Sequence, residues 1–132
     1  MKKETSLKVY ALKKNETKFK NTQITSSESA ANFIRQFYSD DIEIFESFFL
    51  VLLNRANITT GYVKISTGGL AATLCDPILI AKYAVDTLSS SVILCHNHPS
   101  GNLQPSQADK NLTEKVKIPL HCLIVKFWII LF

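Results

Sequence analysis

Two histidines and an aspartate stand at a spacing that suits one metal ion. Residues 96–101 read His-Asn-His-Pro-Ser-Gly, and a short loop leads from them to Asp109. Residues two apart on an extended backbone point to the same side, so His96 and His98 can both reach one ion. Asp109, in the first turn of a following helix, can supply a third ligand. Two imidazoles and one carboxylate suit Zn²⁺ and leave a fourth position for water, which is typical of a catalytic zinc site.

Catalysis at such a site also requires a group that moves protons, and Glu46 is the candidate. It stands at the start of a continuous apolar run, where burial of a carboxylate without a polar partner would cost free energy. Zinc lowers the pKa of its water to about 7 and polarises a substrate carbonyl. Ser106, three residues before Asp109, can donate a hydrogen bond to the developing oxyanion.

Each of these features also has a purely structural explanation. His96-x-His98 alone is a weak signal, and Ser106-x-x-Asp109 is the ordinary spacing of a helix capping box. Glu46 on its own reads as a charge at the edge of a strand, and Gly68-Gly69 as a turn. Their combination at fixed spacing is what favours a metal site.

The residues before the cluster predict a helix and a strand pair. Thr25 and Glu28 have capping-box spacing ahead of apolar residues at helical spacing, so we expect a helix from Thr25 that ends at residues 39–41. The run from 46 to 53 is continuously apolar after its first two residues, which predicts a central strand buried on both faces. Residues 58–65 are rich in β-branched side chains and form a hairpin with it through the turn at 54–57.

The residues around the cluster predict two more helices and a buried strand. Asp76 followed by Pro77 marks the start of a helix that runs to about Leu88. A short buried strand covers 91–95, a loop 96–105, and a last helix runs from Ser106 to about Lys117. With a weak edge strand at 7–12 and a polar loop at 13–21, this order predicts a mixed α/β fold of the α+β type.

These residues resemble a known family. Glu46, His96-x-His98, Ser106 and Asp109 match the JAMM signature of MPN/JAB metalloproteases, and the run from His96 to Asp109 is similar to the RadC subgroup of bacterial JAB proteins. The resemblance covers about residues 25–117. It implies a curved mixed sheet flanked by helices, of the cytidine deaminase-like type. It implies that His96, His98 and Asp109 bind zinc, that Glu46 acts on the water, and that Ser106 assists the oxyanion. The family's label is DNA repair, while the implied activity is that of a zinc metallopeptidase or isopeptidase.

The chain departs from this pattern at both ends. Residues 1–24, a strand and a basic polar loop, contain nothing like the helix-hairpin-helix module of longer relatives; short single-domain relatives of this kind resemble proteins of bacterial mobile elements. In the apolar tail 118–132, Pro119 is expected to end the helix early, and Leu120 stands where the family has an acidic residue. We therefore expect the domain proper to cover 25–117 and the tail to be atypical, as after a truncation or frameshift.

Composition restricts the setting of the protein. The chain has 132 residues and a net charge of +4, with 46% apolar residues, which predicts one ordered domain. Three widely spaced cysteines and no signal peptide favour a cytoplasmic location. The apolar tail is shorter than the roughly 20 residues that a membrane span needs and contains His121 and Lys126, so we expect a strand and no membrane contact.

Three functions follow, in order of preference. The first is a zinc-dependent hydrolase of amide or isopeptide bonds in an unidentified protein or peptide. The second is an inactive copy that keeps the site residues but has lost the C-terminal elements. The third is a DNA-interacting module, which a net charge of only +4 supports weakly.

Overall fold

The computed structural model describes residues 18–38, 40–67 and 76–132. The expected strand at 7–12, most of the basic loop and the Gly68-Gly69 turn lie outside these residues. Within them the elements are α1 (Ser27–Arg35), the 3-10 helix η1 (Asp40–Glu43), β1 (Ser47–Leu53), β2 (Thr59–Thr67), α2 (Pro77–Asp86), β3 (Ser91–His96), α3 (Gln107–Cys122) and β4 (Lys126–Leu131).

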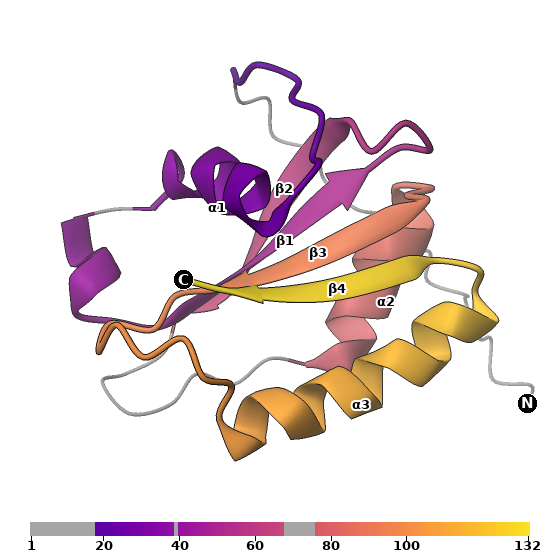
Figure 1. Cartoon of the computed structure of the whole chain (residues 1–132). Coiled ribbons are helices and arrows are strands. Elements are labelled where there is room, and N and C mark those ends of the chain that lie inside the picture. The colour runs from indigo at the N-terminus through magenta and orange to yellow at the C-terminus, as the bar shows by residue number, and fades with distance from the viewer. Residues whose placement is uncertain (1–17, 39, 68–75) are drawn as a thin grey trace, which may run out of the picture.

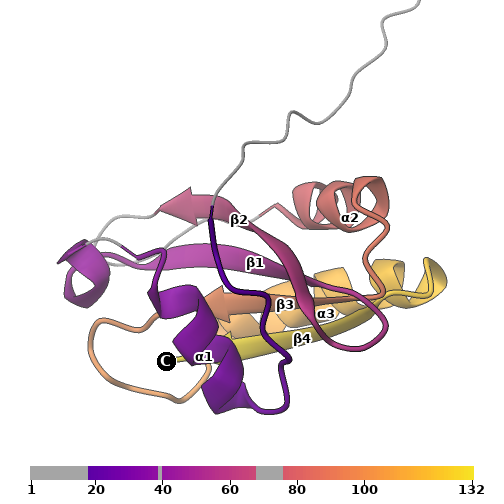
Figure 2. The same cartoon turned by 90° about the horizontal axis from the view of Figure 1, so that it is seen from above.

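The four strands form one mixed sheet in the order β2-β1-β3-β4. β1 pairs antiparallel with both β2 and β3, and β4 pairs parallel with β3. Figures 1 and 2 show α1 on one face of this sheet and α2 and α3 on the other. The predicted mixed α/β fold, with a sheet flanked by helices, is confirmed. Among the described residues, no helix has the length and apolar character that crossing a membrane requires.

All seven residues of β1 are buried, which confirms the predicted central strand. Because successive side chains of a strand point to opposite faces, its apolar run supplies two cores. Phe48, Leu50 and Leu52 pack against the face covered by α2 and α3. The alternate residues pack against the face covered by α1. The hairpin to β2 through residues 54–57 is also present, with the Asn54 amide donating to the carbonyl oxygen of Ile58.

The helix boundaries correct the sequence analysis at α1. Its N-cap is Ser26, with Ser29 as the capping-box partner, so the predicted pairing of Thr25 with Glu28 is wrong by one residue. The helix ends at Arg35, earlier than the expected 39–41. The predicted N-caps of the other two helices are confirmed: Asp76 caps α2 and Ser106 caps α3. In the chain, α2 directly precedes β3 and α3 directly follows it.

The C-terminal residues form regular structure, and the prediction that Pro119 ends the helix is wrong. Pro119 lies inside α3, which continues to Cys122. Val116 and Leu120, one turn apart on α3, are almost fully buried against the sheet, and this packing outweighs the hydrogen bond that proline cannot donate. Residues 126–131 then form β4, so the apolar tail supplies the strand that was expected of it and pairs with β3 along its whole length.

Candidate metal centre

The predicted site residues meet at one end of the sheet. Glu46 directly precedes β1, and the antiparallel pairing of Phe48 with His96 places the beginning of β1 beside the end of β3. The loop after β3 leads to α3, whose first turn contains Asp109. Figure 1 shows the beginning of β1 beside the end of β3. Residues fifty positions apart in the chain therefore become neighbours through one strand pairing.

Among the described residues, Glu46, His96 and His98 form a group that can hold a metal ion, so Glu46 stands in this group where Asp109 was predicted as the third ligand. One carboxylate oxygen of Glu46 and one ring nitrogen of each histidine all lie within 4.8 Å of one another. Oε2 of Glu46 is 3.4 Å from Nε2 of His96. His96 is buried, while Glu46 and His98 are partly exposed, so the group is open to solvent on one side.

Asp109 lies against both histidines. Its Oδ1 is 3.0 Å from Nδ1 of His96, and its Oδ2 is 3.2 Å from Nε2 of His98. The same carboxylate accepts a hydrogen bond from the Ser106 amide at 2.8 Å, and the Asp109 amide donates to the Ser106 hydroxyl oxygen at 3.1 Å. The capping box and the site are thus one structure: the cap of α3 fixes the carboxylate that touches the two imidazoles.

The hydrogen bonds of the two rings indicate which nitrogens can bind a metal. Nδ1 of His98 contacts the carbonyl oxygen of Asn102, so it donates there and leaves the lone pair of Nε2 available. Nδ1 of His96 donates to Asp109 in the same way. Nε2 of His96 is buried and has no hydrogen-bond partner in the part of the chain that the structure describes. A buried nitrogen of this kind needs an explanation, and a metal ion on its lone pair provides one.

Burial and neighbouring groups determine the charges of His96 and Asp109. Burial lowers the pKa of His96 and outweighs the opposite effect of the Asp109 and Glu46 carboxylates. Burial raises the pKa of the Asp109 carboxyl, but hydrogen bonds from Ser106 and the contact with His96 outweigh it, so this pKa lies below its ordinary value. At neutral pH the site therefore holds a neutral imidazole and an ionised carboxylate, the forms in which these side chains bind metal ions.

An aromatic side chain holds the buried histidine ring. Phe48 stacks on His96 with 4.0 Å between ring centroids and 24° between the planes. Because the two residues are paired in the ladder between β1 and β3, the sheet fixes this stack. An apolar wall of this kind keeps solvent from one side of a metal site and strengthens the electrostatic interactions inside it.

Asn97, between the two histidines, has contacts that the sequence analysis did not foresee. It is 2% exposed, and its side-chain amide bonds to the backbone of the segment that contains Glu46. The signal in the sequence was a polar residue at the end of a buried strand, pointing away from the two histidines that flank it. Its partners are backbone atoms, which no sequence motif reveals.

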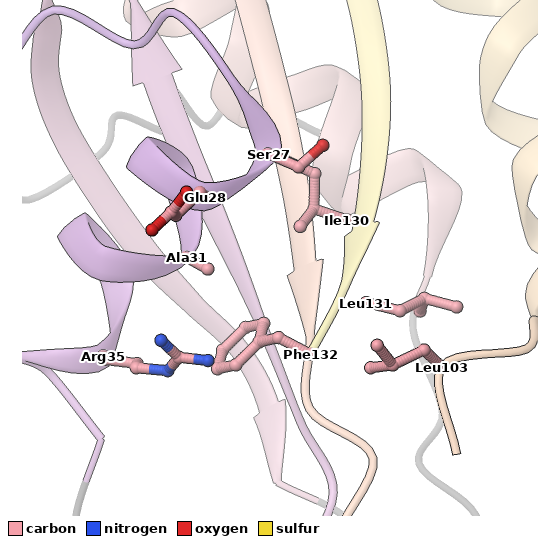
Figure 3. A pocket seen from close by; sticks show the side chains of 8 residues that line it. All are labelled: Ser27, Glu28, Ala31, Arg35, Leu103, Ile130, Leu131 and Phe132. Carbon is pink, nitrogen blue, oxygen red and sulfur yellow. The ribbon is translucent and has the colours of Figure 1, made fainter. Parts of the chain in front are cut away.

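A hollow lies between α1 and the end of β4 (Figure 3). Its volume is about 240 Å³. Its lining residues are Ser27, Glu28, Ala31, Arg35, Leu103, Ile130, Leu131 and Phe132, none of which is a predicted site residue. One of its lining residues, Phe132, is hydrogen-bonded to a site residue, because the His98 amide donates to the backbone oxygen of Phe132 at 2.7 Å.

Comparison with known proteins finds similar sequences. The family model described as "RadC-like JAB domain" matches residues 24–128. A UPF0758 protein of Flavobacterium johnsoniae is 38% identical over 104 residues, which cover 79% of this chain and 44% of that protein. Similar matches are a UPF0758 protein of Porphyromonas gingivalis, 38% identical over 94 residues (71% and 40%), and one of Clostridium beijerinckii, 43% identical over 68 residues (52% and 30%). The chain spans less than half the length of these relatives. The resemblance that the motif indicated is confirmed: the chain belongs to the RadC-like JAB domain family.

Proposed function

We propose that the chain is a zinc-dependent metallohydrolase that cleaves amide or isopeptide bonds in a protein or peptide. The observation that carries this proposal is the buried Nε2 of His96, which lacks a hydrogen-bond partner among the described residues and faces Glu46 and His98. A pair of imidazoles beside carboxylates is a donor set that suits zinc. When bound, zinc supplies Lewis acidity, which acidifies water and polarises a carbonyl group.

The chain's own residues would divide the remaining work. His96 and His98 would bind the metal through Nε2, since Nδ1 of each is turned to an oxygen acceptor. Asp109 would complete the ligand set with Oδ2, the oxygen next to His98. Glu46, which is partly exposed and beside His96, would accept a proton from water and pass it to the leaving amine. Ser106 would donate a hydrogen bond from its hydroxyl group to the carbonyl oxygen as negative charge develops there.

The C-terminal residues support an active enzyme over an inactive copy. The tail on which the inactive alternative rests forms the end of α3 and all of β4, and Leu120 is fully buried.

Free thiols at Cys95 and Cys122 support a cytoplasmic setting, which is reducing. A DNA-interacting role has no comparable support. Its test is the salt dependence of binding to duplex DNA, which should be steep if phosphates are bound and flat if they are not.

The test begins with the metal content of the purified full chain. We expect one zinc per chain and hydrolysis of members of a fluorogenic peptide-amide library that stops on addition of a chelator. His96→Ala and His98→Ala should each lose the bound zinc and the hydrolytic activity. The matched control is His121→Ala, since His121 is the third histidine and is exposed on α3. Retention of zinc and activity in both site variants would contradict the proposal.

A thermal melt distinguishes a chain with an intact metal site from an inactive copy. For an intact site, added zinc should raise the melting temperature of the wild-type chain and a chelator should lower it, because a ligand that binds the folded state stabilises it. The His96→Ala chain should show one melting temperature under both conditions. A broad, metal-independent transition of the wild-type chain would favour the inactive copy.

A further inference from the structure

The side chain of Asn97 is hydrogen-bonded on both of its polar atoms. Oδ1 accepts a hydrogen bond from the Ser47 amide at 2.8 Å. Nδ2 donates to the carbonyl oxygens of Ile42 at 2.7 Å and Phe45 at 2.8 Å. The residue is 2% exposed, so these bonds form away from competing water. Two of the three partners, Phe45 and Ser47, are the residues on either side of Glu46.

The alternation of side chains at the end of β3 explains how Asn97 reaches this segment. His96 and His98 both contact Asp109 on one side, and Asn97 between them points to the other. The ladder between β3 and β1 ends with the pair His96 and Phe48. One position further along, the Asn97 side chain takes the Ser47 amide as its donor and so extends the ladder by one bond.

The carboxamide is suited to this position by its chemistry. The site requires one acceptor and two donors on a short side chain, and among the amino acids an asparagine offers them in one planar group. An aspartate would offer no donor when ionised and would place a charge beside two carbonyl oxygens. A serine would lack the reach and the second donor.

We propose that Asn97 is the positioning residue for the general base: it holds the backbone on both sides of Glu46 and so keeps the Glu46 carboxylate beside the two histidines. The inference rests on the proposed function, since it assigns Glu46 the proton transfer. One strand end then performs two tasks, because His96 and His98 bind the metal while the residue between them positions the base. A displacement of about 1 Å at such a group can cost about a hundredfold in rate.

The first test measures the backbone contact and needs no activity. Hydrogen exchange of the Ser47 amide in the full chain should be at least about tenfold faster in Asn97→Ser, since local protection is lost with the acceptor. The chain should still fold, because the Tyr38 hydroxyl donates to the Ser47 carbonyl oxygen and β1 keeps its two neighbours. The control is Thr59→Val, which removes a fully buried hydroxyl that accepts from the Thr22 amide. Unchanged exchange at Ser47 in Asn97→Ser would overturn the proposal.

The second test asks whether Asn97 acts through Glu46. On a peptide amide that the wild-type chain cleaves, Glu46→Gln should lower kcat by at least about a hundredfold. Asn97→Ser should lower kcat by about 10–100-fold, with KM and zinc content unchanged. The double variant should be no slower than Glu46→Gln alone, because a displaced base costs nothing once the base is absent. A double variant slower than Glu46→Gln by the full Asn97→Ser factor would assign Asn97 a merely structural role and overturn the proposal.

A second variant covers the case in which Asn97→Ser does not fold. Asn97→Asp keeps the size of the side chain and the acceptor for Ser47 but loses both donors, so it should show the same kcat loss with less change in Ser47 exchange. A wild-type chain that binds zinc but cleaves no peptide amide would contradict the proposed function and remove the catalytic part of this inference. The exchange measurement would then still decide the backbone contact.

Discussion

Oδ1 of Asp109 lies 3.0 Å from Nδ1 of His96, the ring nitrogen opposite the one that faces Glu46. This contact decides the tautomer of His96, because a proton on Nδ1 leaves the lone pair on Nε2. The Asp109 carboxylate is itself fixed by the cap of α3 through Ser106. The first turn of a helix therefore orients a ring at the end of a strand, and the start of α3 and the end of β3 act as one unit.

Replacing this carboxylate should weaken metal binding more than it weakens the fold. Asparagine has one side-chain oxygen, so Asp109→Asn keeps either the acceptor for His96 or the oxygen next to His98. We therefore expect the zinc affinity to fall by about 10–100-fold. Competition with a chromophoric chelator measures this. Asp86→Asn is the control, since it removes an exposed carboxylate of α2 that pairs with Lys82. Equal zinc affinities of the two variants would show that Asp109 contributes nothing to the metal site.

The site was predictable from the sequence only in part. His96 and His98 could be paired from their spacing, because alternation along a strand is a local rule. Glu46 lies fifty residues earlier than His96. Its position at the start of an apolar run made it a candidate and the family motif agreed, but only the ladder between β1 and β3 brings it close to His96. The role of Asn97 could not be foreseen, since it depends on backbone atoms of residues 42–47 that only the folded chain brings together.

The same division holds for the fold. The buried runs of β1 and β3 and the caps at Asp76 and Ser106 were predicted because each is fixed by adjacent residues. The start of α1 was wrong by one residue, since Thr25, Ser26 and Ser27 can all act as N-caps. Pro119 was read as a helix end from local chemistry alone, while the burial of Leu120, a tertiary effect, keeps α3 continuous.

Leu120 should contribute strongly to stability if the C-terminal residues belong to the core. It is fully buried among side chains of the sheet and α2, so Leu120→Ala should lower the free energy of unfolding by about 2–5 kcal/mol. Ile118→Ala, two positions earlier on the exposed side of α3, should change it by less than about 0.5 kcal/mol. Urea unfolding of both variants gives the comparison. Similar values for the two would mean that α3 does not dock as described.

Pro119 should cost stability where it stands. A proline inside a helix donates no hydrogen bond and crowds the carbonyl group four residues earlier, here that of Lys115. Pro119→Ala should therefore raise the free energy of unfolding by about 1–3 kcal/mol. Lys117→Ala, an exposed position on the same helix, is the control and should change it by less than about 0.5 kcal/mol. A loss of stability in Pro119→Ala would indicate that a bend of α3 at this point is required for packing.

The buried thiol of Cys95 predicts a loss of stability at alkaline pH. Burial raises its pKa to about 12, and burial with the nearby Cys95 also raises the pKa of Tyr38. In the unfolded chain the thiol loses its proton near pH 8.5, so above that pH the folded state binds more protons and stability falls as pH rises, by up to about 1.4 kcal/mol per pH unit from this group.

Unfolding in urea between pH 7 and pH 11 tests this sign. Cys95→Ala should flatten the decline above about pH 8.5, because the thiol no longer titrates in the unfolded state alone. Cys122→Ala is the control, since it removes an exposed thiol in place of the buried one. Parallel curves for Cys95→Ala and the wild-type chain would contradict the burial of Cys95. Cys95 directly precedes His96 on β3 and packs in the core with residues of α1, so the slope reports the burial of β3 next to the candidate metal site.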